Sequence, residues 1–259
     1  MDGIIKEIKQ REGCYVVVGL PCHIHGFRKY EESDKTFASK IFGYFGLFCS
    51  GTRSFNFTEY LLKERKIDVG GIRYLSYRDE GNLGGLVIDG VNSQGDKYHY
   101  YEDYQHYCHP LRSIFTPRRC FLCIDHFAEL SDISFGDIHI KPYSDDETGI
   151  NSIVVRNQKF DKLLHEAVGD GVMEIETLPV NLLLKAQPVA VLKKERTKTY
   201  LRLDKLRGRA VPKYDSELKD NRLAHSIMSY IKNDALMFVG RHRFLWAMVG
   251  LLKGKKYVQ

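Results

Sequence analysis

The sequence lacks an apolar run long enough to cross a membrane. The longest such run near the carboxyl end, FLWAMVGLL at residues 244–252, is less than half of the ~20 apolar residues that a membrane-spanning helix needs. The first residues alternate charged and apolar side chains without a secretion signal, and repeats and low-complexity stretches are also absent. With 43% hydrophobic and 28% charged residues, we expect a globular, cytoplasmic protein.

Acidic residues are scarce in the last quarter of the chain. Residues 193–259 hold 17 Lys and Arg against 6 Asp and Glu, a net charge of +11, so the +6 of the whole chain leaves −5 for the rest. The excess fits a solvated helical region, or a peripheral contact of basic carboxyl-terminal helices with an anionic membrane surface. The positive charge is the only feature of this region that favours nucleic-acid binding, and we expect none. We predict a domain at 1–190 and a basic helical extension at 191–259.

Strand and helix patterns alternate in the first part of the chain. A β-branched run at residues 14–19 precedes a helix at 23–30, and an aromatic-rich run at 41–51 precedes a helix at 55–65. Such repeats are typical of parallel βαβ units. We expect further strands at 72–78, 85–88 (after a Gly-rich turn at 81–85), 98–101, 132–138 and 152–156, and helices at 3–9, 104–115, 159–168 and beyond 178. The expected fold is α/β to mixed α+β, with a parallel-containing central sheet, flanking helices and a basic helical carboxyl-terminal region.

Six cysteines stand out, because disulfides are rare in a reducing cytoplasm and thiols there more often serve metal or redox chemistry. Cys22 and Cys49 occupy equivalent places in the two strand–helix units. Each follows the carboxyl end of a predicted strand, which is the edge where parallel sheets bind ligands, and each precedes a helix, whose amino terminus stabilises a thiolate. The alternative is a pair of structural core cysteines. Cys14, inside its predicted strand, is expected to be such a core residue.

Cys120 and Cys123 form a CxxC pair in the run RRCFLCID. Two sulfurs from one turn chelate a single metal ion or cluster, and the flanking Arg118 and Arg119 would help to neutralise an anionic cluster. Zinc sites and thiol–disulfide exchange use the same pair.

Four thiolates suit a 4Fe–4S cluster or a tetrahedral zinc ion. Zinc ribbons usually combine two CxxC pairs, whereas this chain has one pair and two isolated cysteines far apart. The spacing favours a 4Fe–4S cluster held across a folded domain by Cys22, Cys49, Cys120 and Cys123, with zinc and purely structural cysteines as alternatives. Cys108 is the reserve candidate for a ligand.

Five blocks, in the same order, resemble the coenzyme F-420 hydrogenase/dehydrogenase beta-subunit family. VGLPCHIHGFRK (18–29) resembles the family's GTPCQIAGLR-type motif, and LFCSGTRS (47–54) resembles its second cysteine motif. IRYLSYRDEGNLGG (72–85) resembles the next segment, without its tryptophan. RRCFLCIDHFAELSDISFGDI (118–138) resembles the CxxC block, and TGINSIVVRN (148–157) a following strand.

The resemblance implies an iron–sulfur flavoprotein, an oxidoreductase that passes electrons between a 4Fe–4S cluster, FAD and a deazaflavin-type or other small acceptor. Cys22, Cys49, Cys120 and Cys123 fall on the family's motif cysteines. The sequence does not contain the ferredoxin-type segment of many members, so the chain resembles a short form, a split gene product or a truncated copy. We expect it to work with a redox partner protein or ferredoxin-like chain. Some members lie near genes for polysaccharide assembly, which implies a link to polysaccharide biosynthesis.

Polar residues near these cysteines are the expected catalytic and cofactor-binding side chains. His23, in place of a family Gln, would hydrogen-bond a sulfur or relay a proton, and Arg28 would bind a flavin phosphate or an acidic substrate. Gly136 would admit a planar ring. The expected flavin-binding residues are Asp132, Ser134, Gly136, Asp137, Asn151 and Ser152. Helix starts and a capped strand are the alternative explanation for these positions.

Two other functions remain open on the sequence. One is a zinc-stabilised, non-catalytic accessory protein of a glycan-assembly pathway, which zinc content in place of iron would favour. The other is a structural remnant without a cofactor, which thermal stability unaffected by replacing both Cys120 and Cys123 would favour.

Overall fold

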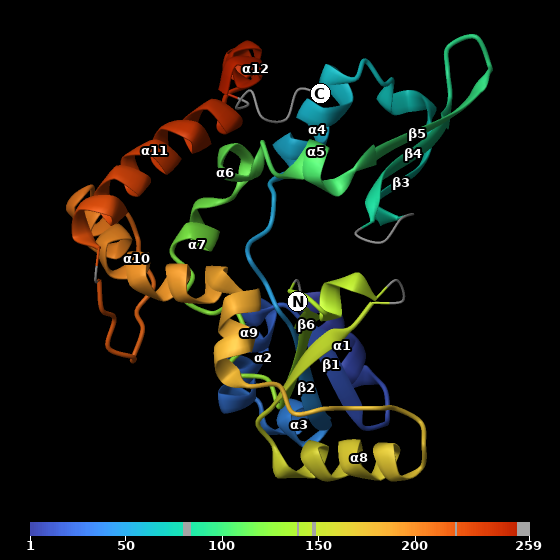
Figure 1. Ribbon diagram of the computed structural model, residues 1–259, viewed down its shortest axis with the longest axis vertical. Coiled ribbons are helices and arrows are strands. Elements are labelled where there is room, and N and C mark those ends of the chain that lie inside the picture. The colour runs from blue at the N-terminus through green and yellow to red at the C-terminus, as the bar shows by residue number, and fades with distance from the viewer. Residues whose placement is uncertain (80–83, 139, 147–148, 221, 253–259) are drawn as a thin grey trace. The chain divides into compact units, whose positions relative to one another are not determined.

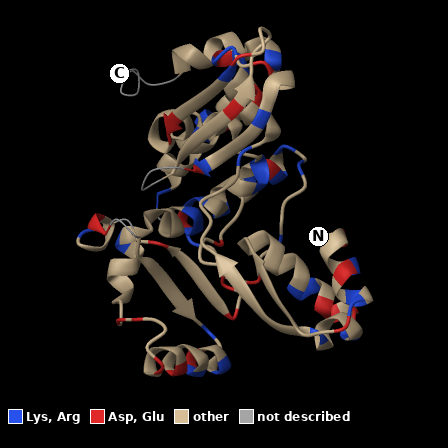
Figure 2. Ribbon diagram, turned by 90° about the vertical axis from the view of Figure 1, so that its right-hand side faces the viewer, with Lys and Arg blue, Asp and Glu red and all other residues tan. Residues whose placement is uncertain are grey.

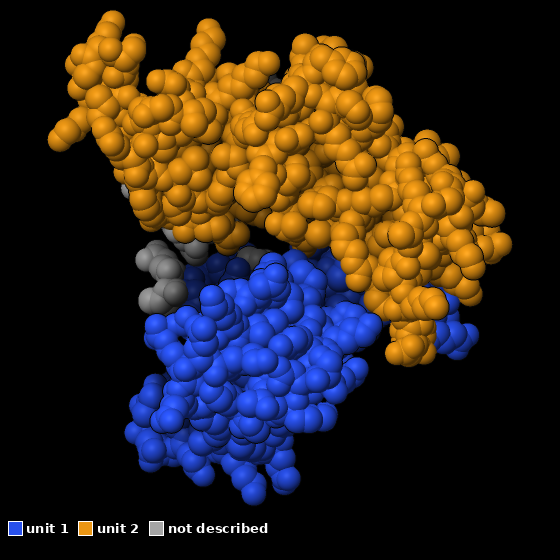
Figure 3. All heavy atoms as spheres, turned by 180° about the vertical axis from the view of Figure 1, so that it is seen from behind, with its two compact units in different colours: residues 1–50, 123–197, 217–219 blue, residues 51–122, 198–216, 220–259 orange. Residues whose placement is uncertain are grey.

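The computed structural model describes residues 1–79, 84–138, 140–146, 149–220 and 222–252. The chain forms two compact units, each discontinuous in sequence (Figure 3). Unit 1 comprises residues 1–50, 123–197 and 217–219, and unit 2 comprises residues 51–122, 198–216 and 220–259. The boundary between Leu122 and Cys123 therefore falls inside the CxxC pair.

Unit 1 is built on a four-stranded sheet with the strand order β1-β2-β6-β7 (Figure 1). The strands are β1 (Tyr15–Gly19), β2 (Ile41–Leu47), β6 (Ile133–Asp137) and β7 (Asn151–Val155). β2 is parallel to both β1 and β6, whereas β7 is antiparallel to β6. Together with the helices, this sheet confirms the predicted α/β to mixed α+β fold and its parallel strands.

Unit 1 also contains several helices. They are α1 (Asp2–Gln10), α2 (Pro21–Ser33), α3 (Lys35–Ser39), α8 (Gln158–Gly169), α9 (Val180–Ala186) and the first part of α10 (Pro188–Leu206), with a 3-10 turn at Tyr143–Asp145. α2 begins with Pro21, whose fixed φ suits the first helical turn. Ile24 and Phe27 of α2 form one buried cluster with Val17 and Tyr44 of the sheet. Burial of such side chains contributes about 1.5–3 kcal/mol each, which anchors the start of α2 against β1 and β2.

Unit 2 contains an antiparallel sheet with the order β3-β4-β5. Its strands are β3 (Ile72–Asp79), β4 (Gly85–Val91) and β5 (Lys97–Asp103). Its helices are α4 (Phe55–Glu64), α5 (Tyr104–Cys108), α6 (Arg112–Phe115), α7 (Arg118–Phe121), the rest of α10, α11 (Leu223–Arg241) and α12 (Val249–Leu252). Two 3-10 turns lie at Val69–Gly71 and Arg243–Met248. Leu86 and Ile88 of β4 share one buried cluster with Phe115 and Trp246. The segment around Trp246 is therefore part of the core of unit 2.

Some elements differ from the prediction. The helix expected over residues 104–115 is two helices, α5 and α6, because Pro110 lacks an N–H group and its ring clashes with the preceding turn. The strand expected over residues 41–51 ends at Leu47. The short helices α3 and α7 have no predicted counterpart. Most of the Gly-rich turn predicted at 81–85 lies outside the described residues.

Some of the basic residues near the carboxyl end form ion pairs within unit 2. Asp204 and Asp234 pair with Arg209, Asp234 also pairs with Arg207, and both carboxylates pair with Arg118 from earlier in the chain. In unit 1, α8 carries both signs of charge (Figure 2). The division into 1–190 and 191–259 stays a prediction, since the two units are defined by contacts alone and residues of α10 belong to both.

No single described helix is long and apolar enough to cross a membrane. α11 reaches that length and composition only together with Arg243–Leu252, and the two segments meet at a bend of 115°. α11 is also apolar on the side that faces solvent. Met228, Ile231 and Phe238, which share one face by helical spacing, are exposed by 68%, 62% and 55%.

Candidate functional site

Cys22 and Cys49 lie beyond the same edge of the sheet in unit 1. Gly19 at the end of β1 pairs with Gly46 of β2, and each cysteine comes three residues after its glycine. Cys22 is in the first turn of α2, and Cys49 is in the loop after β2. His23, which follows Cys22, is exposed. Because β1 and β2 are parallel, both cysteines follow the carboxyl ends of neighbouring strands, where such sheets bind ligands.

A buried lysine joins the Cys49 and Cys123 segments. Lys193 is 1% exposed, and its Nζ donates to the backbone oxygens of Cys49 and Asp125, each at 2.7 Å. The same Nζ lies 3.8 Å from Cys123 Sγ. Lys193 therefore holds two cysteine segments that are far apart in sequence, and it adds a positive charge beside a sulfur.

Further contacts fix the loop that follows β2. The Cys49 N–H donates to the backbone oxygen of His126 at 2.9 Å. His126 Nε2 lies 3.0 Å from Gln187 Oε1, and the Phe48 ring packs against the His126 ring with centroids 5.9 Å apart. The position of Cys49 thus depends on three segments of unit 1.

The Asp125 side chain shapes the turn after the CxxC pair. The Cys123 thiol donates to the Asp125 backbone oxygen at 3.3 Å, and both carboxylate oxygens of Asp125 accept from the Glu129 N–H at 3.1 Å. Burial raises the pKa of the Asp125 carboxyl, although the Glu129 N–H and the charge of Lys193 oppose this. Asp125 is a structural residue of this loop.

Cys120 belongs to unit 2, in the single turn of α7, where its N–H donates to the Pro117 backbone oxygen at 3.0 Å. Gly51, with φ of +134°, comes so close that a Cβ at this position would lie 3.5 Å from Cys120 Cβ. Gly51 is two residues after Cys49. The Cα atoms of Cys120 and Cys123, three residues apart, can be separated by at most about 11 Å. Short stretches of chain therefore link Cys120 to two of the other cysteines.

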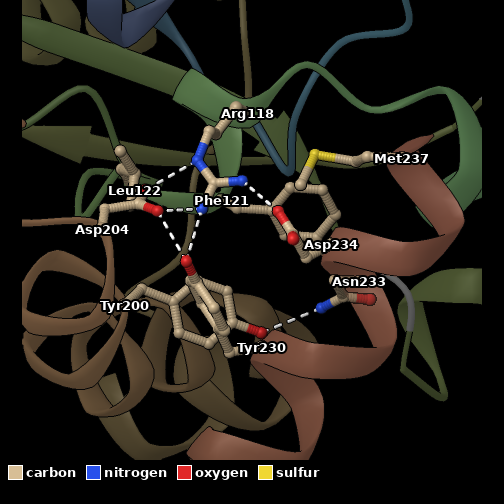
Figure 4. A pocket seen from close by; sticks show the side chains of 9 residues that line it. All are labelled: Arg118, Phe121, Leu122, Tyr200, Asp204, Tyr230, Asn233, Asp234 and Met237. Carbon is tan, nitrogen blue, oxygen red and sulfur yellow. Dashed lines mark hydrogen bonds and ion pairs between the residues drawn. The ribbon is translucent and has the colours of Figure 1, made fainter. Parts of the chain in front are cut away.

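Arg118, two residues before Cys120, is held by an ionic network within unit 2 (Figure 4). Its Nε donates to Asp204 Oδ2 at 2.7 Å, and its terminal nitrogens contact Asp204, Asp234 and the Tyr230 hydroxyl. Asp204 is fully buried. Burial by itself would raise the pKa of Asp204, but hydrogen bonds from Arg118 and Tyr230 outweigh it and hold the pKa below its usual range.

The two arginines beside the CxxC pair were expected to help neutralise a cluster. The charge of Arg118 is instead balanced by Asp204 and Asp234. Arg119 Nη1 donates to the Tyr214 hydroxyl at 3.2 Å. Arg118 thus anchors α7 to the helices of unit 2.

The other two cysteines lie outside the predicted set of ligands. Cys14 precedes β1 and is exposed, so its prediction as a core residue is wrong. Cys108 is buried in unit 2, with Sγ 3.6 Å from Arg53 Nη2. Among the residues that the structure describes, no three His, Cys, Asp or Glu side chains gather closely enough to hold a metal ion. The predicted ligands therefore stay a prediction, which requires the four thiols to converge.

Asp137 and Asn151 lie at the same edge of the sheet as the cysteines. They pair with each other across β6 and β7, and both are exposed. Leu47 of β2 pairs with Phe135 of β6. Cys49 comes two residues after Leu47, and Asp137 comes two residues after Phe135, so the two residues follow their strands by the same distance along the chain. Asp137 and Asn151 therefore lie at the sheet edge where parallel strands bind ligands, and their predicted role in flavin binding stays a prediction.

Ser134, Gly136 and Ser152 contact the protein itself. Ser134 is fully buried and accepts a hydrogen bond from Arg156 at 3.0 Å, and Ser152 Oγ donates to the Gly136 oxygen at 2.7 Å. A Cβ at Gly136 would lie 2.1 Å from the Phe48 ring. The planar ring beside Gly136 in this structure is therefore that of Phe48, and flavin binding by these three residues stays a prediction.

Asp132 and Arg28 lie toward the opposite end of the strands. The Asp132 carboxylate, just before β6, accepts from the Tyr44 N–H at 2.7 Å, from Arg28 at 3.1 Å and from Asn157 at 2.8 Å. Arg28 also donates to the Leu130 oxygen, and its guanidinium carbon lies 4.4 Å from the centre of the Tyr44 ring. These contacts join α2 to β2 and β6, which gives both residues a structural role. Their predicted binding roles stay predictions.

Lys193 has no counterpart among the residues predicted from the sequence. It is the first of the basic residues that make up the charge excess of 193–259, and its immediate neighbour Lys194 is an ordinary exposed partner of Glu129, at 2.5 Å. The sequence gives no local signal that separates the two lysines.

Comparison with known proteins identifies the family of this chain. An uncharacterized protein of Methanocaldococcus jannaschii is 23% identical over 177 residues, which cover 67% of this chain and 59% of that protein. The F420-reducing NiFe hydrogenase complex from Methanosarcina barkeri contains a chain with a TM-score of 0.49 and 18% identity, over 77% of this chain and 65% of that chain. This chain thus spans less than two thirds of the length of either. Residues 13–180, well over half of the chain, match the family described as the C terminus of the beta subunit of coenzyme F420 hydrogenase/dehydrogenase, and the protein belongs to that family.

Proposed function

We propose that this protein is an iron–sulfur flavoprotein module, which transfers electrons between a 4Fe–4S cluster, FAD and a small acceptor of the deazaflavin type. One observation carries the proposal: in a member of this beta-subunit family, a single buried lysine contacts both the Cys49 and the Cys123 segments. Cys22, after the neighbouring strand, and Cys120, three residues from Cys123, complete a set of four thiols. Such sets are the common ligands of 4Fe–4S clusters.

When bound, the cluster supplies one-electron transfer, and the flavin couples one-electron to two-electron steps. The residues of the chain would hold these groups and control their surroundings. Phe48, the neighbour of Cys49, packs its ring against His126 and would limit water access there, which matters because solvent exposure changes a cluster's potential. His23, exposed beside Cys22, would exchange a proton with solvent through a ring nitrogen. Asp137, at the same sheet edge, offers a carboxylate to the polar groups of a flavin.

The proposal includes a second protein. The family description is that of a beta subunit, so we assign the other electron donor or acceptor to a redox partner protein or ferredoxin-like chain. Free thiols need a reducing compartment such as the cytoplasm, and we propose that location for the complex.

Metal and flavin analysis after anaerobic purification tests the proposal. We expect about four irons and four sulfides per chain, with the broad absorption of a thiolate-bound cluster, and flavin in the same sample. Replacing Cys120 and Cys123 with Ser should remove most of the iron, whereas Cys14→Ser, at an exposed cysteine outside the proposed set, should leave it. Zinc without iron would instead favour a zinc-stabilised accessory protein of glycan assembly. A protein with neither metal nor flavin would refute the redox function.

We also propose that the outward face of α11 contacts an anionic membrane surface. Its exposed apolar stripe of Met228, Ile231 and Phe238 is accompanied on the same helix by exposed Lys232 and Arg241. Helices with this combination bind membranes by burying the apolar side chains and attracting anionic lipids.

Sedimentation with lipid vesicles tests this contact. The protein should bind vesicles rich in phosphatidylserine and not vesicles of phosphatidylcholine alone, and Phe238→Asp should weaken the binding. Val172→Asp is the matched control, because Val172 is an exposed apolar residue of unit 1, by 77%. Equal binding by both variants, or no binding by the unaltered protein, would contradict the contact.

A further inference from the structure

The β3-β4-β5 sheet of unit 2 has a second face, opposite the core. Ile88 of β4 is buried in the core cluster to which α4 contributes, and its neighbours Leu75 of β3 and Tyr100 of β5 pack against the same cluster. Side chains alternate between the two faces along a strand, so the residues between these three project from the other side. We call that side the outer face.

Two tyrosine rings lie on the outer face. Tyr101 of β5 covers Gly85 of β4, because a Cβ at Gly85 would overlap its ring, and its hydroxyl donates to Asp103 Oδ1 at 2.9 Å. The Tyr74 hydroxyl of β3 donates to Asp79 Oδ2. Each hydroxyl is thus held by a carboxylate farther along its own strand. Tyr74 and Tyr101 nevertheless stay 47% and 41% exposed, which is a large aromatic surface in contact with water.

Carboxylates accompany these rings on the outer face. Asp89 of β4, between the two outer strands, contacts His99 Nδ1 of β5 at 2.7 Å, and its side chain is 45% exposed. Asp79 and Asp103 lie at the end of the sheet where the tyrosine hydroxyls are held. The basic Lys97 pairs with Val91 at the other end of the strands. The part of the outer face that carries the tyrosines therefore also carries negative charge.

We propose that the outer face of this sheet binds a segment of a partner protein that is rich in lysine and arginine. The argument is charge complementarity. Carboxylates form charge-assisted hydrogen bonds with lysine and arginine, and the face of a tyrosine ring attracts the same cations. The same carboxylates repel the phosphates of nucleic acids and of anionic lipids. Tyrosine is also enriched in the surfaces that proteins use to bind each other. This inference does not depend on the proposed electron transfer.

Fluorescence anisotropy with the purified full chain and a labelled oligo-lysine peptide tests the inference. The peptide should bind, more weakly as salt is added, and an oligo-glutamate peptide of the same length should not. Tyr101→Ser should weaken binding by about twofold to fivefold, the effect of one exposed cation–π contact, whereas Tyr101→Phe keeps the ring and should bind normally. Asp89→Asn should also weaken binding. Asp215→Asn is the matched control, because it removes the same charge from an exposed residue elsewhere in unit 2.

Each outcome decides for or against the outer face. Weaker binding by Asp89→Asn than by Asp215→Asn would support it, and this comparison holds even if Tyr101→Ser does not fold, because the Asp89 side chain is well exposed. Equal binding by these two variants, or no binding of oligo-lysine by the unaltered protein, would overturn the inference. Sedimentation of the protein alone tests a second copy as the occupant. A dimer that Asp89→Asn dissociates would replace the different partner with a second copy of this chain.

Discussion

Removal of the Asp204 carboxylate should be among the most damaging changes in unit 2. Asp204 is fully buried, and its carboxylate accepts hydrogen bonds from Arg118, Arg209 and the Tyr230 hydroxyl. In Asp204→Ala these donors lose a shared acceptor. The side chain of Arg118, which is 16% exposed, then keeps its charge in a mostly buried site.

The expected loss of folding stability depends on the contacts that Arg118 keeps in Asp204→Ala. Removing one partner of a buried ion pair costs about 3–5 kcal/mol. Arg118 still contacts Asp234 and Tyr230 in the variant, so the cost should lie at the lower end, about 3 kcal/mol. Asp204→Asn keeps an oxygen acceptor without the charge and should lose less.

Urea unfolding at pH 7, followed by circular dichroism, measures this loss. The matched control is Asp215→Ala, because Asp215 is an exposed residue of the same unit and exposed substitutions usually change stability by less than about 0.5 kcal/mol. If the free energy of unfolding of Asp204→Ala lies within about 1 kcal/mol of the control, a small part of the expected loss, the network adds little to stability. The argument from its burial would then be wrong.

Three further predictions concern packing, backbone and pH. Gly136→Ala should lower the thermal midpoint, with a cost of about 1–3 kcal/mol, because the new Cβ would overlap the Phe48 ring; an unchanged midpoint would contradict this packing. Gly51→Ala should destabilise the protein by about 1–3 kcal/mol, because φ of +134° is strained for any residue with a Cβ, and urea unfolding would measure the loss. Acid should destabilise unit 2, because the pKa values of Asp204 and Asp234 are lower in the folded protein than in the unfolded chain. Burial opposes the ionisation of both carboxyls, but hydrogen bonds from arginines outweigh it and lower both pKa values. Their contribution is therefore complete above the unfolded pKa of about 3.9 and is lost as the pH falls through the lower folded values. Unfolding measured from pH 6 downward should show this loss, and Asp204→Asn should reduce it.

Local sequence patterns were sufficient for the framework of the site. Short β-branched runs followed by helix starts predicted β1 with α2 and β2 with α4, and the parallel register of β1 and β2 then put Cys22 and Cys49 beyond the same edge. Such patterns are informative because side-chain period and turn residues act over a few neighbouring positions. The same local reasoning missed the split at Pro110, although the signal was present in the sequence, and it assigned Cys14 to the core because a residue beside an apolar strand was taken as part of it.

What the sequence by itself determined is the fold class, the strand–helix order and the family motifs, since each depends on residues close together in the chain. The tertiary structure alone decided which polar groups are buried and what they contact. Lys193 meets Cys123 across 70 residues and Cys49 across 144, and Arg118 meets Asp204 across 86. Lys193 and Lys194 are the same residue type at adjacent positions, yet one is buried beside a thiol and the other is paired in solvent. Only the packing of distant segments, which sets the local dielectric and the available partners, distinguishes them.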